Sequence, residues 1–313
     1  MTAESTNPKA WTIGLVGYGE VGRILAEDLR AQDVKVVAYD LKLGGNKAGA
    51  LREHAATHGV ALVASHADLA RQSDFIVSAV TASQAVPVAQ ACAPAVSKNA
   101  FFLDFNSASP GAKQRAAKLI DAGGGRYVEG AVMTSIPPYR IKVPLLLGGA
   151  AAEELAPLLA QLGFNAKVAS TQLGISSAVK MCRSIMIKGL EAMTIECFTT
   201  ARAYGVEDAV LASFAETFPG IDWEKQGAYF FQRVIEHGRR RAEEVREVAE
   251  TVREAGLTPW SAQGTAERQA FIADLADEGL FGTRGTKTFA RSADWRIEAD
   301  RILAACKPKS QAS

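Results

Sequence analysis

Short runs of β-branched and aromatic residues alternate with alanine-rich amphipathic stretches through the first half of the chain. The apolar runs at residues 11–16, 34–39, 75–79 and 101–105 have the length and the bounds of buried strands. Between them, the amphipathic stretches at 20–31, 47–58 and 84–93 predict helices. Further strands are expected at 126–132, 143–147 and 166–168, with a helix at 151–162. Strand, helix and strand at this spacing predict βαβ units, and therefore a doubly wound parallel sheet of the α/β class.

The pattern changes after Gly174, where almost every segment predicts helix. Residues 176–204 contain no proline, and their apolar positions recur every three or four residues as one stripe, at Val179, Cys182, Met186, Leu190, Met193 and Cys197. We therefore expect an N-terminal Rossmann domain at 10–172, followed by an all-helical domain at 173–306. The terminal segments 1–9 and 307–313 are expected to be disordered.

Composition and charge favour a globular protein that acts on small molecules. Of the 313 residues, 48% are hydrophobic and 22% charged, and 35 Lys and Arg against 34 Asp and Glu leave a net charge of +1. This balance predicts no nucleic-acid partner and no membrane partner. No apolar stretch approaches the roughly 18 residues that span a bilayer, and residues 1–9 lack the apolar core of a signal peptide. The four cysteines have no Cys-x-x-Cys spacing, so we expect a reducing, cytoplasmic location.

A glycine-rich turn, Gly17-Tyr18-Gly19-Glu20-Val21-Gly22, follows the first predicted strand and opens the first predicted helix. A pyrophosphate needs a tight turn, a backbone without Cβ atoms in its way and the free N–H groups of a helix N-terminus. The turn offers all three in order, so we expect these six residues to bind a dinucleotide. The alternative is that the glycines serve only a tightly packed turn.

Residues at the ends of the next strands are expected to contact the same cofactor. Asp40 ends the second strand, where an acid accepts hydrogen bonds from the adenosine ribose and repels a 2′-phosphate. This favours NAD, and NADP is the alternative because Lys42 and Lys47 lie nearby. Val80 and Thr81 follow the third strand and complete the predicted cofactor set.

Asn106 and Ser107 follow the strand at 101–105. Ligands of open α/β sheets bind beyond the carboxyl ends of the strands, so we expect these two side chains to bind the polar groups of a small substrate. The alternative is that they cap the next helix.

One face of the predicted 176–204 helix is cationic. Lys180, Arg183, Ser184 and Lys188 fall within about 140° of arc, opposite the stripe, and they suit an anionic substrate. A partly desolvated Lys180 beside Arg183 would have a lowered pKa and would serve as a base. The alternative is an ordinary solvated helix face.

The remaining basic residues and histidines give weaker signals. The run at 237–241 would reach the cleft between the two predicted domains, or bind a phosphate, or would form an exposed basic turn beside several glutamates. His54, His58 and His66 are expected at the surface. No set of His, Cys, Asp and Glu residues has the spacing of metal ligands, so no metal is expected.

Together these residues resemble the β-hydroxyacid dehydrogenase superfamily, which includes 6-phosphogluconate and 3-hydroxyisobutyrate dehydrogenases. The resemblance rests on the turn at 17–22, on 104–110, on Leu147-Gly148-Gly149 and on Gly174 followed by Lys180. It implies that Lys180 is the general acid/base and that Asn106 and Ser107 bind substrate. It also implies that the helical domain at 173–306 serves substrate binding and dimerisation. The 218–241 stretch is similar to a C-terminal domain of poorly characterised phosphogluconate-dehydrogenase-like proteins.

Three positions depart from the superfamily pattern. The loop at 129–135 reads Glu-Gly-Ala-Val-Met-Thr-Ser instead of Asp-Ala-Pro-Val-Ser-Gly-Gly, which places Met133 and Thr134 against the substrate. Arg183 replaces an asparagine. Ile187 replaces the acidic glutamate of the phosphogluconate enzymes, so decarboxylation of 6-phosphogluconate is not expected.

We therefore expect a homodimeric NAD(P)-dependent oxidoreductase that transfers hydride between a small anionic β-hydroxy acid and nicotinamide. Two alternatives stay open. One is an imine or carbonyl reductase on the same scaffold, against which the presence of Lys180 argues. The other is a sensor that binds a dinucleotide without turnover.

Overall fold

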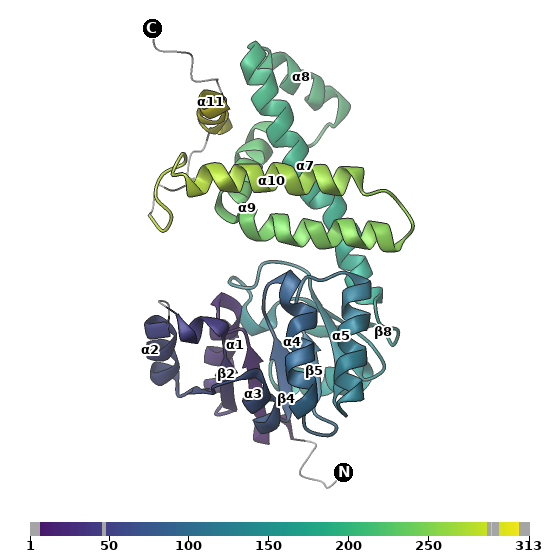
Figure 1. The fold of residues 1–313 in the computed structure, drawn as a ribbon. Coiled ribbons are helices and arrows are strands. Elements are labelled where there is room, and N and C mark those ends of the chain that lie inside the picture. The colour runs from purple at the N-terminus through teal and green to yellow at the C-terminus, as the bar shows by residue number, and fades with distance from the viewer. Residues whose placement is uncertain (1–6, 46–47, 287–288, 290–293, 307–313) are drawn as a thin grey trace. The chain divides into compact units, whose positions relative to one another are not determined.

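The chain forms two compact units, Met1–Cys182 and Arg183–Ser313, and the division falls inside helix α7 (Ile175–Tyr204) (Figure 1). The sequence analysis placed the domain boundary near residue 172. The structure, a computed structural model, describes residues 7–45, 48–286, 289 and 294–306. The expected disordered segments 1–6 and 307–313 lie outside the described residues, as does Lys47. Residues 8 and 9, also expected to be disordered, instead belong to a short 3-10 turn, Pro8–Ala10, which the Asn7 side chain caps.

An eight-stranded sheet organises the first unit, in the order β3-β2-β1-β4-β5-β6-β7-β8. Neighbouring strands pair in parallel, except that β7 is antiparallel to β6. The strands are β1 (Thr12–Val16), β2 (Lys35–Tyr39), β3 (Ala61–Leu62), β4 (Phe75–Ser78), β5 (Phe101–Asp104), β6 (Arg126–Val132), β7 (Leu145–Gly148) and β8 (Ala166–Ser170). The chain leaves β1 toward β2 on one side and returns to β4 on the other. The carboxyl ends of β1 and β4 therefore flank the topological switch point, where open α/β sheets bind ligands.

Helices cover both faces of this sheet and divide its apolar core in two. Helices α1 (Glu20–Arg30), α2 (Ala48–His58) and α6 (Ala152–Gln161) pack on one face. Helices α3 (His66–Gln72), α4 (Ala85–Cys92) and α5 (Pro110–Ala122) pack on the other, and Figure 1 shows α4 and α5 in front of the strands. Successive strand residues point to opposite faces, so Leu15 belongs to the first core and Val16 to the second. This arrangement confirms the predicted doubly wound sheet.

Every predicted strand and helix of the first unit is present, with ends shifted by at most two residues. The prediction missed β3, α3 and α5. Side-chain caps define where α3 and α5 begin: Ser65 accepts from the Asp68 N–H, and Ser109 accepts from the Ala112 N–H with Pro110 in the first helical position. Ser109, and not Asn106 or Ser107, therefore caps the helix that follows β5.

The described part of the second unit is all helical, as predicted. Besides its part of α7 it contains α8 (Glu207–Thr217), α9 (Trp223–Glu254), α10 (Trp260–Asp277) and α11 (Trp295–Cys306). Figure 1 shows α9 and α10 side by side. Gly238 allows this close packing, because a Cβ there would lie 2.8 Å from the Gln269 carbonyl oxygen. Phe198, Phe231 and Trp295 are almost fully buried in the core of this unit. Among the described residues, no helix is both long and apolar enough to cross a bilayer.

Candidate functional site

In the glycine turn between β1 and α1, two glycines have no room for a side chain, and the third has open space beside it. Gly17 has φ +89°, and a Cβ on it would lie 2.4 Å from the Ala79 carbonyl oxygen. A Cβ on Gly22 would lie 2.0 Å from the Gly17 carbonyl oxygen. A Cβ on Gly19 would meet no atom within 4 Å, and Gly19 begins α1 without a side-chain cap. This open space in front of an uncapped helix N-terminus fits a pyrophosphate.

Tyr18 and Asp40 support the turn from inside the protein. The Tyr18 side chain is fully buried, and its backbone N–H donates to Asp40 Oδ2 at 2.8 Å. The other Asp40 oxygen accepts from the Lys42 N–H, also at 2.8 Å. A carboxylate has about four lone-pair positions, so Asp40 retains acceptor capacity for a ribose hydroxyl. The Tyr18 side chain is directed away from the open space at Gly19, toward His54 on α2.

The remaining predicted cofactor residues lie at the same edge of the sheet. Glu20 is exposed and Val21 is half-buried in the first turn of α1, while Val80 and Thr81 follow β4. Arg23 was not among the predicted cofactor residues, and its Nε donates to the Gly19 carbonyl oxygen at 3.3 Å. The position of Arg23, a basic residue directly after the third glycine, could have predicted it.

Asn106 is buried and joins the ends of β4 and β5. Its Oδ1 accepts from the Val80 N–H at 2.7 Å, and its Nδ2 donates to the Ser78 hydroxyl at 3.0 Å. Its own N–H donates to Asp104 Oδ1 at 2.8 Å. Asn106 therefore holds the predicted cofactor residue Val80 in place, and its amide is already engaged inside the protein.

Lys180 and Ser107 are two predicted site residues that lie far apart in the chain but are in contact in the structure. Lys180 Nζ donates to Ser107 Oγ at 2.6 Å, and both side chains are half-buried. Met133 and Thr134 follow β6, which is parallel to β5, so they lie at the same carboxyl edge of the sheet. Met133 is half-buried and Thr134 is exposed.

A buried glutamate caps the helix that carries Lys180. Glu129 Oε1 accepts from the N–H groups of Gly174 and Ser176 at 2.9 and 3.0 Å, and Oε2 accepts from the Ser177 hydroxyl at 2.7 Å. A carboxylate at a helix N-terminus is favoured by the helix dipole. In the sequence, Glu129 stood out only as part of the loop at 129–135 that departs from the superfamily pattern, because its partners lie more than forty residues downstream.

A second buried acid was also missed. Asp104 at the end of β5 is fully buried and forms an ion pair with buried Lys113 on α5, with 3.0 Å between Nζ and Oδ1. The Tyr127 hydroxyl donates to Asp104 Oδ2 at 2.7 Å. Burial and the neighbouring Asp104 charge raise the pKa of Tyr127 well above its ordinary value, so the phenol stays protonated. These contacts fix the strand end that precedes Asn106 and Ser107.

Arg183, Ser184 and Lys188 belong to the second unit. Arg183 is exposed, whereas Ser184 and Lys188 are buried. Lys188 pairs with Glu244 on α9 at 2.6 Å, so the predicted cationic face receives an acid from another helix. Burial lowers the pKa of Lys188, and the Glu244 charge only partly opposes this effect. The substrate role of these three residues stays a prediction.

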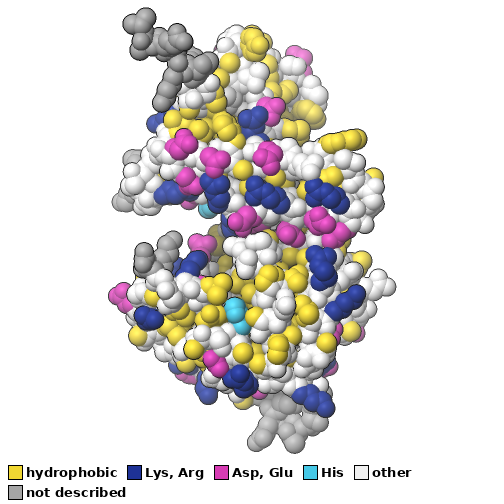
Figure 2. All heavy atoms as spheres, viewed as in Figure 1, with side chains coloured by type: hydrophobic (Ala, Val, Ile, Leu, Met, Phe, Trp, Pro, Cys, Tyr) yellow, Lys and Arg dark blue, Asp and Glu magenta, His cyan; other side chains and the backbone are white. Residues whose placement is uncertain are grey.

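The basic run at 239–241 lies inside α9, not in a turn, and its arginines are paired. Arg239 contacts Asp274 and Asp277, Arg240 contacts Glu244, and buried Arg241 contacts Glu191. Figure 2 shows side chains of both charges interleaved over α9 and α10. The half-buried His237 has a pKa lowered by burial.

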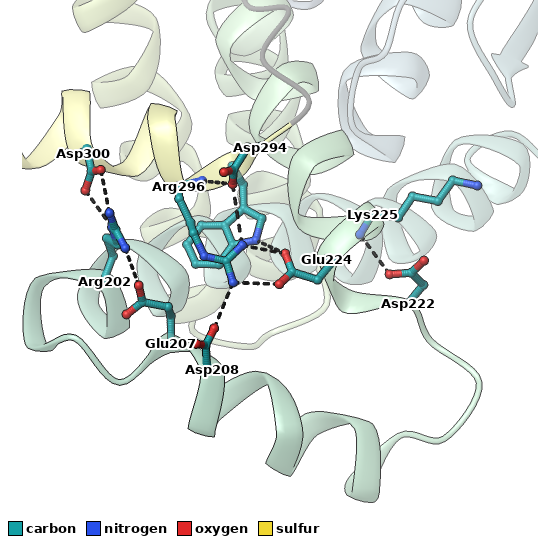
Figure 3. Close-up of polar contacts among 10 residues, drawn as sticks. Arg202, Glu207, Asp208, Asp222, Glu224, Lys225, Asp294, Arg296 and Asp300 are labelled. Carbon is teal, nitrogen blue, oxygen red and sulfur yellow. Dashed lines mark hydrogen bonds and ion pairs between the residues drawn. The ribbon is translucent and has the colours of Figure 1, made fainter.

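A second ion-pair network fastens α11 within this unit (Figure 3). Arg202 on α7 contacts Glu207 and Asp300, and Arg296 on α11 contacts Glu224 at 2.7 Å. In both networks, the charged side chains pair with one another within the second unit.

The histidines of the first unit correct the sequence analysis. His54, His58 and His66 are half-buried, and burial lowers the pKa of His66. His54 and His58 are four residues apart on α2, and Glu27 on α1 completes a group whose potential ligand atoms lie within 4.8 Å of one another. The sequence led us to expect no metal, whereas the fold brings together three residues that could hold one.

Known proteins match both parts of the chain. Residues 12–170 match the family described as the NAD binding domain of 6-phosphogluconate dehydrogenase, and residues 201–272 match a domain of unknown function, DUF1932. A solved conserved hypothetical protein from Sinorhizobium meliloti 1021 is 38% identical, with a TM-score of 0.73, over 96% of this chain and 99% of its own.

Two 3-hydroxyisobutyrate dehydrogenases are also similar. The mitochondrial enzyme of Drosophila melanogaster is 25% identical over 228 residues, which cover 72% of this chain and 68% of that protein. The Mycobacterium tuberculosis enzyme, solved with L-serine, shares the fold at 14% identity, with a TM-score of 0.69 over 95% of this chain and all of its own. The glycine turn, the switch point and the match over 12–170 agree, and the chain belongs to the family of the NAD binding domain of 6-phosphogluconate dehydrogenase, with NAD(P) as its cofactor.

Proposed function

We propose that this protein transfers hydride between NAD(P) and a small anionic β-hydroxy acid, with Lys180 as the general acid/base. The observation that carries the proposal is the 2.6 Å hydrogen bond from Lys180 Nζ to Ser107 Oγ. Ser107 follows β5 at the carboxyl edge of the sheet, and neighbouring Asn106 is bonded to the Val80 N–H beside the coenzyme turn. An amine held at this edge suits proton transfer next to a bound coenzyme.

In this proposal, one set of residues binds the coenzyme and another residue transfers the proton. The turn at 17–22 and the N-terminus of α1 would hold the pyrophosphate, and Asp40 the ribose hydroxyls. When bound, NAD(P) supplies the hydride acceptor for oxidation and the hydride donor for reduction. In oxidation, neutral Lys180 gives one N–H to Ser107 and uses its lone pair to take the proton of the substrate hydroxyl. In reduction, the protonated amine returns that proton to the carbonyl oxygen.

Three features support an anionic substrate and NAD. Arg183 is exposed three residues after Lys180, at the position where the superfamily has a neutral asparagine. A relative of 25% identity is a 3-hydroxyisobutyrate dehydrogenase, whose substrate is a small hydroxy acid. The negative charge of Asp40, at the end of β2, would repel the 2′-phosphate on the ribose of NADP, which supports NAD over NADP.

The test is an absorbance screen at the reduced-nicotinamide band. Wild type, Lys180→Ala and Ser107→Ala are run against a panel of β-hydroxy acids, with NAD and NADP in separate wells. Lys180→Ala should lower kcat by about 10² to 10⁴, while coenzyme affinity stays within a few-fold. Lys118→Ala is the matched control, because Lys118 is an exposed lysine of the same unit.

Each alternative has its own outcome in that screen. Near-normal turnover of Lys180→Ala would remove this residue from the chemistry. Turnover of neutral imines or ketones, indifferent to Arg183→Ala, would favour the reductase alternative. Coenzyme binding without turnover of any compound would favour the sensor. We further propose a reducing, cytoplasmic location, because the four cysteines have no Cys-x-x-Cys spacing.

We also propose that two copies pair through the stripe on α7. Met186 and Met193 lie seven residues apart on one face of this helix and are 62% and 60% exposed. Large apolar side chains in such a row mark a protein contact surface. Light scattering should give twice the chain mass of 33.2 kDa, and Met186→Glu with Met193→Glu should return the mass to 33.2 kDa. A wild-type monomer would contradict the pairing.

A further inference from the structure

Two histidines and a glutamate meet beside the coenzyme turn, on α1 and α2 of the first unit. His54 and His58 are four residues apart, so they lie on the same face of α2. Glu27 faces them from α1, and one potential ligand atom from each residue lies within 4.8 Å of the other two. All three residues are half-buried. Paired histidines at this helical spacing are a recurrent zinc-binding arrangement.

Hydrogen bonds already hold two of these three side chains. His54 Nε2 lies 3.0 Å from Glu27 Oε1, and His54 Nδ1 lies 2.9 Å from the Tyr18 hydroxyl. Arg140 donates to Glu27 Oε2 at 2.7 Å. One Glu27 oxygen is thus fixed by arginine, while the other faces the imidazole.

We propose that Glu27, His54 and His58 form a binding site for a divalent transition-metal ion of the Zn²⁺ type. Two imidazoles and one carboxylate are a donor set that zinc accepts with a fourth position open, and nitrogen donors disfavour Mg²⁺ and Ca²⁺. The ion takes the place between His54 Nε2 and Glu27 Oε1. Bonds of about 2.0–2.1 Å to a tetrahedral ion place ligand atoms roughly 3.3 Å apart, so side-chain rotation closes the site around it.

Tyr18 supplies the outer contact that such a site requires. Metal at Nε2 places the proton of neutral His54 on Nδ1, and the Tyr18 oxygen lies 2.9 Å away to accept it. The Arg140 charge opposes the ion, and we therefore expect moderate affinity. Because Tyr18 stands in the coenzyme turn, the ion would link α1 and α2 to that turn.

The experiment is equilibrium competition for Zn²⁺ between the full chain and a chromophoric chelator. Wild type should bind one Zn²⁺ per chain, and His58→Ala should weaken binding about tenfold or more. His58 is the first choice because removing it leaves the Tyr18–His54–Glu27 contacts in place. His66→Ala is the matched control, a half-buried histidine on α3 outside the group, and should bind like wild type.

Cobalt separates this site from the exposed cysteines Cys182 and Cys306. Co²⁺ bound by imidazole and carboxylate lacks the thiolate charge-transfer absorption that cysteine ligands give. If His58→Ala does not fold, Glu27→Gln tests the same ligand set. The proposal is overturned if millimolar Zn²⁺ does not bind, if His58→Ala or Glu27→Gln binds like wild type, or if the bound Co²⁺ shows thiolate absorption that Cys182→Ser or Cys306→Ser abolishes.

Discussion

Glu129 on β6 accepts a hydrogen bond from the Ser177 hydroxyl in the first turn of α7, at 2.7 Å. The other carboxylate oxygen accepts from two backbone N–H groups of the same helix start. Lys180 stands less than one turn further along α7. Glu129 therefore fixes the helix that carries Lys180, without itself being placed to touch a substrate.

Glu129→Gln should damage both stability and turnover. The glutamine amide cannot accept hydrogen bonds at both ends, so buried donors lose their partner at a cost of about 1–3 kcal/mol in the free energy of unfolding. Displacement of Lys180 should lower kcat at saturating substrate, while coenzyme affinity at the distant turn changes little. Urea unfolding, coenzyme titration and steady-state kinetics measure the three quantities.

Ser177→Ala is the matched control for this position. It removes one hydrogen bond and leaves the two backbone contacts of Glu129 intact, so its effects on kcat and stability should be smaller. A Glu129→Gln variant with unchanged kcat would show that Lys180 is positioned without it.

Alanine at Gly19 and at Gly22 should separate coenzyme binding from folding. Gly19→Ala adds a methyl group to open space, so the free energy of unfolding should stay within about 0.5 kcal/mol of wild type. The same methyl group occupies the predicted pyrophosphate position, and coenzyme affinity should fall at least tenfold. Gly22→Ala should destabilise the fold by about 1–3 kcal/mol, because its Cβ would lie 2.0 Å from the Gly17 carbonyl oxygen. Equal coenzyme affinity in Gly19→Ala and wild type would place the pyrophosphate elsewhere.

Asp40→Asn should shift coenzyme preference toward NADP. The change removes a charge-assisted acceptor, worth about 1.5–3 kcal/mol, and ends the repulsion of a 2′-phosphate. The ratio of kcat/KM for NAD to that for NADP should fall about tenfold or more. Asp74→Asn is the control, because Asp74 also accepts a backbone N–H, from Thr12 at 2.8 Å, at the opposite end of β1. An unchanged ratio in Asp40→Asn would remove this residue from ribose recognition.

His66 should make stability fall on mild acidification. Burial against Tyr39 and its surroundings lowers the pKa of His66, and the Asp40 charge only partly offsets this effect. The unfolded chain protonates near the ordinary pKa of 6.5, above the folded value. Between these two values the unfolded state binds more protons, so the free energy of unfolding decreases as pH falls. His66→Gln should lose less stability than wild type between about pH 7.5 and 5.5 in urea unfolding; an equal loss would contradict the assignment.

The sheet and most helices could be predicted because their apolar periods are local. Helices α3 and α5 were not predicted. Helix α3 spans only His66–Gln72, too few residues for a periodic signal. Helix α5 (Pro110–Ala122) is long enough, and its start is marked mainly by the cap Ser109 and by Pro110 in the first helical position. The candidate site divides in the same way. The glycine turn is contiguous, whereas the contacts of Glu129 with α7 and of Glu27 with His54 join residues far apart in the chain.

Asn106 has a consequence for redesign of this protein. Its amide bonds the end of β4 to the end of β5, so the coenzyme side and the Ser107 side of the site are one rigid piece. The exposed Thr134 lies on a different strand end, after β6. Under the proposed function, a library confined to residues 133–135 would vary side chains beside the proposed substrate position while leaving the Asn106 link between β4 and β5 intact.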